Sequence, residues 1–199
     1  RSAVDWQGCV YEKEQYQRVT KKLRKALDTA GLKDVLILGP EGAIIDDNWT
    51  ILGGKDLPDL KRDPELTRAI GAIAHHTYNE GYGTKDPRDF EAYNRAAVAS
   101  GKDLWMTEWS RTCGWEGETL DSVITTVRPM IRDLVLLQNN YYIYWYGWRS
   151  SDYPLAGALL CGHPPNLIRT KNFYIFKKLF NSARPGCVVR RLVTTDPDL

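Results

Sequence analysis

The sequence lacks long apolar runs, nucleotide-binding glycine motifs and closely spaced cysteines, and each absence excludes a class of protein. No hydrophobic stretch reaches the roughly 20 residues that a membrane-spanning helix needs. The segment "LGPEGA" at residues 38–43 fits neither the GxGxxG nor the P-loop pattern, which argues against a nucleotide fold. The cysteines show no CxxC spacing, so we expect no metal site and no cofactor, and their even number permits two disulfides without indicating the pairing: Cys9, Cys113, Cys161 and Cys187.

An excess of charge of one sign is also missing. The chain has 27 Lys and Arg against 25 Asp and Glu, a formal net charge of +2. The basic cluster "KKLRK" at residues 21–25 fits the solvated face of a helix, so no nucleic-acid partner is expected. Aromatic residues, by contrast, are abundant: seven Trp and eleven Tyr. Many follow predicted strands, where a flat ring suits the face of a sugar; the alternative is packing in the core or at the rim.

Helical and strand patterns alternate along the chain. Apolar spacing, Asp-Pro starts and glycine stops predict five helices, the fourth kinked near Pro129: 12–31, 63–69, 86–101, 118–140 and 170–186. Short apolar runs predict four buried strands: 34–42, 69–78, 103–110 and 141–148.

This alternation implies an α/β fold in which parallel strands are joined by crossover helices. Four strand–helix units amount to half of a (β/α)8 barrel. Functional side chains gather at the C-terminal ends of the strands both in such barrels and in doubly wound sheets. A doubly wound α/β protein with an unrelated ligand is therefore the alternative fold.

The segment "LWMTEWS" at residues 104–110 ends a predicted buried strand with one carboxylate, Glu108. Burying an unpaired carboxylate is costly, so Glu108 needs either a partner or a chemical role. The alternative is a structural ion pair with Arg111 or another basic residue. Alternation along the strand puts Met106 on the face of Glu108 and the flanking tryptophans on the other: Trp105 beneath the helices and Trp109 at the rim.

The same alternation sorts the residues after the preceding strand. His76 and Tyr78 share a face, whereas His75 is expected to face the helices. His76 is placed to hydrogen-bond Glu108 and orient it, or alternatively to bond to backbone. No matching carboxylates accompany the histidine pair, so the pair does not indicate a metal site.

These segments resemble the clan A retaining glycoside hydrolases, and specifically family 30, whose members include glucosylceramidase-like enzymes. "LWMTEWS" looks like the family's seventh strand, "VLILGPEGA" like the fifth and "IAHHTY" like the sixth. "KNFYIFKKLFNSARPGCVVRRL" is similar to the last barrel helix and the start of an appended β-sandwich. The resemblance implies that residues 1–186 form the second half, strands 5–8, of a (β/α)8 TIM barrel, and that residues 187–199 are the stub of a β-sandwich strand.

The resemblance also implies a function. The chain would be part of a retaining β-glycoside hydrolase that cleaves a β-linked glycan or glycoside by double displacement. Glu108 would be the catalytic nucleophile, and the substrate-binding residues would be His76, Tyr78, Trp145, Trp148, Trp49 and Glu41. The location would be extracellular or lumenal.

The sequence departs from the family in one respect. The family's acid/base Glu lies in an Asn-Glu-Pro motif after the fourth strand, and this chain contains no such motif. We expect that glutamate shortly before Arg1, in a preceding segment or a companion chain, so the fragment alone should be nearly inactive. Glu41 and Glu80 are weaker internal candidates. The alternative function is a non-catalytic carbohydrate-binding or scaffold module built on a degenerate barrel.

Overall fold

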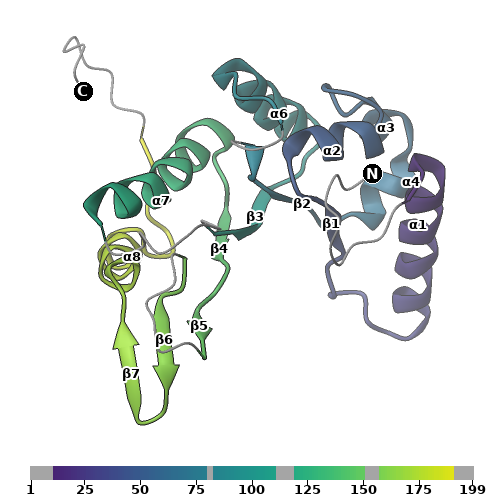
Figure 1. Ribbon diagram of the computed structural model, residues 1–199. Helices are drawn as coiled ribbons and strands as arrows, with labels where there is room; N and C mark the ends of the chain where they lie inside the picture. Colours follow the sequence, from purple (N-terminus) through teal and green to yellow (C-terminus); the bar gives the residue numbers. More distant parts are fainter. Residues whose placement is uncertain (1–10, 80–82, 111–118, 151–156, 191–199) are drawn as a thin grey trace. The chain divides into compact units, whose positions relative to one another are not determined.

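The structure is a computed structural model that describes residues 11–79, 83–110, 119–150 and 157–190 (Figure 1). These residues form two compact units. The first unit runs through Trp109 and includes Asn139–Tyr144, and the second comprises Ser110–Gln138 and continues from Trp145. Within the described ranges, no helix has both the length and the apolar character needed to cross a membrane.

The first unit is built on a four-stranded parallel sheet. Its strands are β1 (Leu38–Gly42), β2 (Ala72–His76), β3 (Leu104–Trp109) and β4 (Tyr141–Tyr144). They lie side by side in chain order, β1-β2-β3-β4, with every neighbouring pair parallel. The predicted parallel α/β arrangement is confirmed. A doubly wound sheet would reverse its strand order at a switch point, and these four strands show no such reversal.

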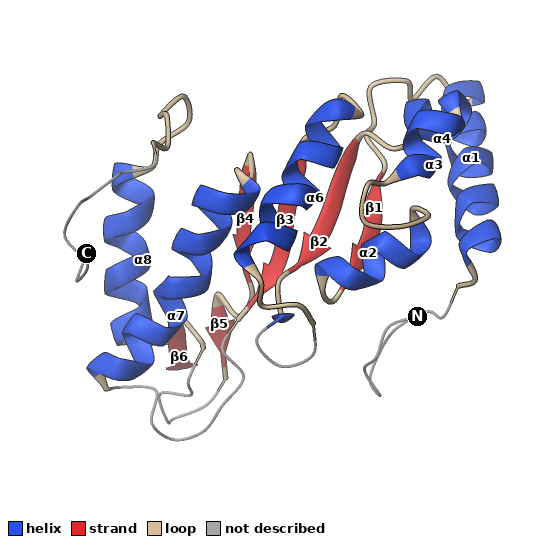
Figure 2. Cartoon of the chain, turned by 90° about the horizontal axis from the view of Figure 1, so that it is seen from above, coloured by secondary structure: helices blue, strands red, loops and turns tan. Residues whose placement is uncertain are grey.

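Helices connect and cover these strands. They are α1 (Lys13–Thr29), α2 (Ile45–Ile51), α3 (Pro58–Arg62), α4 (Pro64–Ala69) and α6 (Pro87–Ala99). Figure 2 shows α2 and α6 on one side of the sheet. As predicted, Asp63 and Asp86 cap α4 and α6, because their side chains accept hydrogen bonds from the first-turn amides. The sequence did not reveal α2, whose N-cap residue, Ile44, provides no side-chain hydrogen bond.

Helix α1 matches its predicted span, but its apolar positions are not its buried ones. Val19 and Leu23 are each 46% exposed, whereas Thr20 and Arg24 are buried. The Arg24 guanidinium is buried without an energetic conflict because it donates to Asp28 and to two backbone carbonyls of the following loop. Hydrogen bonding by Arg24 therefore contributes to the burial of this face of the helix.

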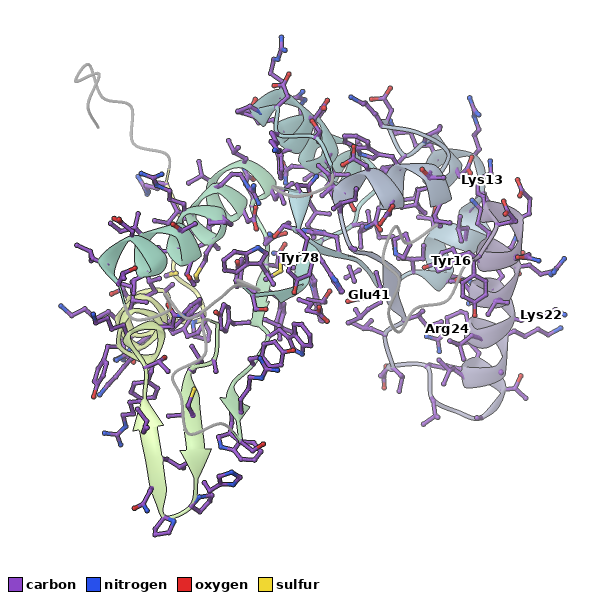
Figure 3. All side chains as sticks on the ribbon, viewed as in Figure 1. Lys13, Tyr16, Lys22, Arg24, Glu41 and Tyr78 are labelled. Carbon is purple, nitrogen blue, oxygen red and sulfur yellow. The ribbon has the colours of Figure 1, made fainter. Side chains whose placement is uncertain are left out.

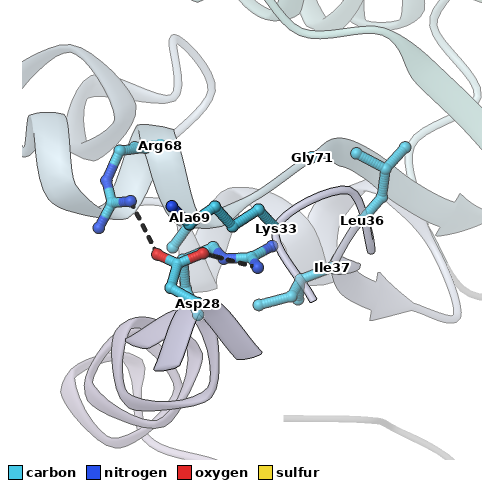
Figure 4. A pocket seen from close by; sticks show the side chains of 8 residues that line it. Asp28, Lys33, Leu36, Ile37, Arg68, Ala69 and Gly71 are labelled. Carbon is cyan, nitrogen blue, oxygen red and sulfur yellow. Dashed lines mark hydrogen bonds and ion pairs between the residues drawn. The ribbon is translucent and has the colours of Figure 1, made fainter. Parts of the chain in front are cut away.

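Strand β1 is shorter than predicted and is not buried on both faces. Val35 and Leu36 are exposed and precede the strand. Beside them, a cavity of about 530 Å³ lies at the N-terminal end of β1 and β2 (Figure 4). Asp28 bonds both guanidinium groups of this cavity, Arg24 and Arg68. One carboxylate balances only one of the two guanidinium charges, and Lys33 adds a third cation, so the cavity keeps a net positive charge at the end of the sheet opposite the strands' C-termini.

The described residues of the second unit form helical segments and a small sheet. Helix α7 (Leu120–Arg132) contains Pro129 and passes directly into a π-helical turn, Asp133–Leu137. The sheet has the order β5 (Trp148–Arg149), β6 (Leu160–His163) and β7 (Asn166–Arg169), and α8 (Lys171–Ser182) follows it. The sequence did not predict this sheet.

Two sequence predictions change from β4 onward along the chain. The predicted strand 141–148 is split, because β4 ends at Tyr144 and Tyr146 adopts a left-handed φ of 71° before β5 begins. Residues 187–190 form no strand, and the rest of the predicted β-sandwich strand lies outside the described residues. Cys161 and Cys187 carry no disulfide, while Cys9 and Cys113 lie outside the described ranges.

Candidate functional site

Near their C-terminal ends, β1 and β3 each contain one residue that has no partner in the neighbouring strand β2. The residues on either side of Glu41 in β1 pair with successive residues of β2, and so do the residues on either side of Thr107 in β3. Glu41 accordingly has a left-handed φ of 68°. Both residues are β-bulges, which bend a strand and redirect its side chains, often beside active sites.

The bulge at Thr107 decides which face of the sheet carries Glu108. His75 packs its ring 5.5 Å from a tyrosine ring of α6, so it faces the helices as predicted. Met106 pairs with His75 and lies on the same face, whereas Glu108 pairs with His76 on the opposite one. The prediction that Met106 and Glu108 share a face is therefore wrong, because the extra residue interrupts the period-two alternation.

The flanking tryptophans also differ from their predicted positions. Trp105 pairs with Ala74 on the face turned away from α6, and its ring centroid lies 4.1 Å from that of Tyr141. It is consequently not beneath the helices. Trp109 is buried instead of lying exposed at a rim, and its ring centroid is 6.0 Å from that of Tyr144.

Five polar side chains from three strand ends meet on the face that carries Glu108. The Tyr78 hydroxyl donates to Glu108 Oε1 at 3.1 Å. Imidazole Nε2 of His76 lies 3.1 Å from Glu41 Oε1, and Nδ1 lies 3.7 Å from Glu108 Oε1. The Thr107 hydroxyl donates to Glu41 Oε1. Tyr78 and Glu41 are labelled in Figure 3.

This geometry refines the predicted roles of His76 and Tyr78. Their rings meet edge to face with centroids 5.9 Å apart, so they share a face as predicted. The 3.7 Å between His76 Nδ1 and Glu108 Oε1 exceeds the length of a hydrogen bond. Tyr78, and not His76, therefore donates the hydrogen bond that orients Glu108.

The carboxylates of Glu41 and Glu108 differ in their hydrogen bonds and in their exposure. Burial acts to raise the pKa of Glu41, but hydrogen bonds from His76 and Thr107 outweigh it and hold that pKa below its usual value. A general acid needs a raised pKa, so Glu41 is suited to remain a carboxylate and not to donate a proton. The Glu108 side chain is 32% exposed, which leaves it accessible to a ligand.

Other predicted residues lie away from this cluster. Trp49 lies on α2 and is 7% exposed, with its ring against Tyr93 and the Lys55 ammonium 4.7 Å from its centroid. It does not occupy a strand end, because the chain after β1 turns into α2 and buries it between helices. Glu80 and Arg111 lie outside the described residues.

Trp145 and Trp148 belong to the second unit. Trp145 is 39% exposed and stacks on Tyr146, with centroids 3.9 Å apart. Trp148 is 50% exposed, and its indole N–H donates to the Gly162 carbonyl at 3.0 Å. Each presents open ring surface. In the part of the chain that the structure describes, no group of three or more His, Cys, Asp or Glu is arranged to hold a metal ion.

Two further residues shape the site, and sequence reasoning missed both. Thr107 contacts Glu41 only because it is a bulge residue. Asn48 on α2 is fully buried: its Oδ1 accepts from Gly42 N–H at 2.9 Å, and its Nδ2 donates to the Ala74 carbonyl at 2.9 Å and the Tyr93 hydroxyl at 2.6 Å. Asn48 thus fastens the backbone beside the Glu41 bulge to β2 and α6.

Asn48→Ala is expected to lower the free energy of unfolding by roughly 2–4 kcal/mol, because it leaves three buried polar groups without their partner. Urea unfolding followed by circular dichroism measures this loss. The matched control is Asn140→Ala at an exposed position, which should change stability by no more than about 0.5 kcal/mol. Equal stabilities for the two variants would contradict the structural role of Asn48.

The chain is similar to known proteins both in fold and in sequence. Its fold is similar to that of a family 30 subfamily 8 xylanase from Clostridium acetobutylicum, with a TM-score of 0.57, 20% identity, and coverage of 86% of this chain and 36% of the xylanase. A family 30 endoxylanase from Clostridium papyrosolvens gives a TM-score of 0.58, 19% identity, and coverage of 92% and 39%. The chain therefore spans little more than a third of these enzymes. No curated protein is a significant sequence match.

The fold likeness supports the predicted resemblance to family 30 but not its glucosylceramidase-like branch. The sequence itself matches a different model, that of glycosyl hydrolase family 59, over residues 2–153. That match includes β1 to β4 and every residue of the cluster around Glu108. Because it extends over well more than half of the sequence, the chain belongs to glycosyl hydrolase family 59.

Proposed function

We propose that this chain is part of a retaining β-glycoside hydrolase in which Glu108 is the catalytic nucleophile. The observation that carries the proposal is the placement of Glu108 at the C-terminal end of a parallel strand, on a partly open face, with Oε1 bonded to Tyr78. The C-terminal ends of parallel strands are where α/β barrels build their active sites. Family membership supports the same reaction class.

In this mechanism Glu108 attacks the anomeric carbon while a second carboxyl group protonates the leaving oxygen. The bond to the leaving group breaks and a glycosyl ester forms on Glu108; water then hydrolyses the ester, with the second carboxyl acting as base. Tyr78 holds Oε1 and so leaves Oε2 to attack. A nucleophile fixed in this way loses little orientational freedom in the transition state.

The second carboxyl group is proposed to come from an Asn-Glu-Pro segment outside these 199 residues. On this proposal β1 to β4 are strands 5–8 of a (β/α)8 barrel, and a β-sandwich follows the barrel. β1 and β4 are the outer strands of the sheet, and they leave large apolar side chains exposed: Leu38, Tyr141 and Ile143. Unpaired, apolar edge strands are normally covered in native proteins.

The proposed substrate is a β-linked glycan or glycoside encountered in an extracellular or lumenal compartment. The exposed rings of Trp145 and Trp148 are suited to the C–H face of a sugar. Separately, in the first unit, His76 and Tyr78 offer polar atoms to the hydroxyl groups of a sugar bound at Glu108. Trp49 is not part of this proposal, because its ring is buried.

A mechanism-based fluorosugar or epoxide inhibitor tests the proposal directly. Mass spectrometry after incubation should find one glycosyl or cyclitol adduct, on the peptide that contains Glu108. Glu108→Gln should abolish the adduct, while Glu14→Gln, at a carboxylate that is 77% exposed on α1, should not. Sugar binding without any adduct would instead favour a non-catalytic carbohydrate-binding module.

A further inference from the structure

We propose that Glu41 is a positioning residue that keeps the neutral His76 imidazole in its Nε2–H tautomer, and so keeps the imidazole proton away from Glu108. The inference rests on the proposed function, since it assigns Glu108 as the nucleophile. It gives Glu41 a role that does not require contact with substrate. The role follows from the way the two bulges bring three side chains together.

The contact between Glu41 and His76 determines that His76 Nε2 carries a proton. An ionised carboxylate only accepts hydrogen bonds, so the 3.1 Å contact between Glu41 Oε1 and His76 Nε2 needs the proton on Nε2. Neutral imidazole carries a single N–H, and the partner of one ring nitrogen determines the state of the other. In the neutral ring, Nδ1, 3.7 Å from Glu108 Oε1, is therefore the nitrogen without a proton.

Glu41 is itself held in place for this task. It is the bulge residue of β1 with a φ of 68°, and the Thr107 hydroxyl donates to the same Oε1 that accepts from His76. Asn48 fastens the neighbouring Gly42 amide to α2. Glu41 Oε1 is thus held by contacts from both bulges in addition to its contact with the His76 imidazole.

The alternative tautomer would act on the nucleophile. With its proton on Nδ1, His76 would donate toward Glu108 Oε1, which already accepts from Tyr78. A second hydrogen bond to the carboxylate stabilises the charged ground state more than the transition state, where that charge is being lost to the new ester bond. By holding the proton on Nε2, Glu41 leaves Glu108 with the one donor that orients it.

Nitrogen-15 NMR of the histidine rings measures the tautomer in the 199-residue chain. The sequence has three histidines, so the ring signals are few enough to assign: His75, His76 and His163. Spectra are recorded over a range of pH, and the tautomer is determined from the species in which one ring nitrogen carries a proton. Wild-type His76 should give the nitrogen shifts of an Nε2–H ring. An Nδ1–H ring in the wild-type chain would overturn the inference without any variant.

Two substitutions at position 41 distinguish the effect of the Glu41 carboxylate from the effect of the backbone conformation at that residue. Glu41→Gly removes the carboxylate, and glycine accepts the positive φ without strain, so the fold should be retained. His76 should then change from nearly all Nε2–H to mostly Nδ1–H. Glu41→Gln keeps an acceptor oxygen at the same reach and should retain Nε2–H. Glu14→Gln is the remote control, and unfolding midpoints verify that all variants fold.

The outcomes separate this inference from the proposed function. An unchanged His76 tautomer in Glu41→Gly would overturn the inference, because a merely structural role for Glu41 does not move the imidazole proton. Inhibitor labelling of Glu108 should in addition be slower in Glu41→Gly than in Glu41→Gln. If wild-type Glu108 takes no label while the tautomer changes as expected, the proposed function fails and the positioning of His76 by Glu41 stands.

Discussion

Glu108→Gly is expected to lower the hydrolysis of β-glycosides by roughly 10⁴–10⁶-fold, the scale of loss found when a catalytic nucleophile is removed. Without the carboxylate no glycosyl ester forms, and the double displacement has no first step. Initial rates measured on the enzyme that joins this chain to the acid/base segment test the expectation. The partly open position of Glu108 predicts that the variant folds as the wild type does.

Added azide should restore turnover to Glu108→Gly and reveal the stereochemistry. Azide fits the space left by the side chain and attacks the anomeric carbon from the face that Glu108 used. A β-glycoside with an acidic phenol as leaving group should therefore yield the α-glycosyl azide, identified by proton NMR. A β-glycosyl azide would show that Glu108 is the acid/base residue instead. Glu14→Gln is the matched control and should keep wild-type rates.

The 199-residue chain alone is expected to react with activated glycosides in strong preference to unactivated ones, by about 10²–10⁴-fold, the usual contribution of a general acid. An acidic phenol leaves without being protonated, whereas an alkyl alcohol does not. Among the candidates within the chain, Glu41 is held as a carboxylate because the hydrogen bonds from His76 and Thr107 outweigh its burial and lower its pKa. Single-turnover release of the aglycone from a series of aryl and alkyl β-glycosides measures the preference.

The control is the same series with the acid/base segment restored, where the preference should shrink to within about tenfold as protonation is regained. Equal rates for aryl and alkyl glycosides with the chain alone would contradict the proposal. They would mean that this chain contains its own proton donor, and Glu80 would then be the first residue to test.

Local chemistry was sufficient to predict much of the fold. Asp63 and Asp86 each precede a proline and cap a helix, which needs only neighbouring residues. The continuous apolar run at residues 69–74 predicts that β2 is a buried strand. By contrast, the β5-β6-β7 sheet escaped prediction, since its short strands carry no comparable local signal.

The sequence by itself determined that Glu108 ends a strand, that His76 and Tyr78 share a face, and that the strands are parallel. Only the tertiary structure decided that Met106 lies on the face opposite Glu108, and that Glu41 and Thr107 meet beside Glu108. The reason is physical: a bulge is defined by a residue left unpaired against the neighbouring strand. Side-chain alternation along one strand contains no information about that pairing, so a single extra residue reverses every facing inferred beyond it.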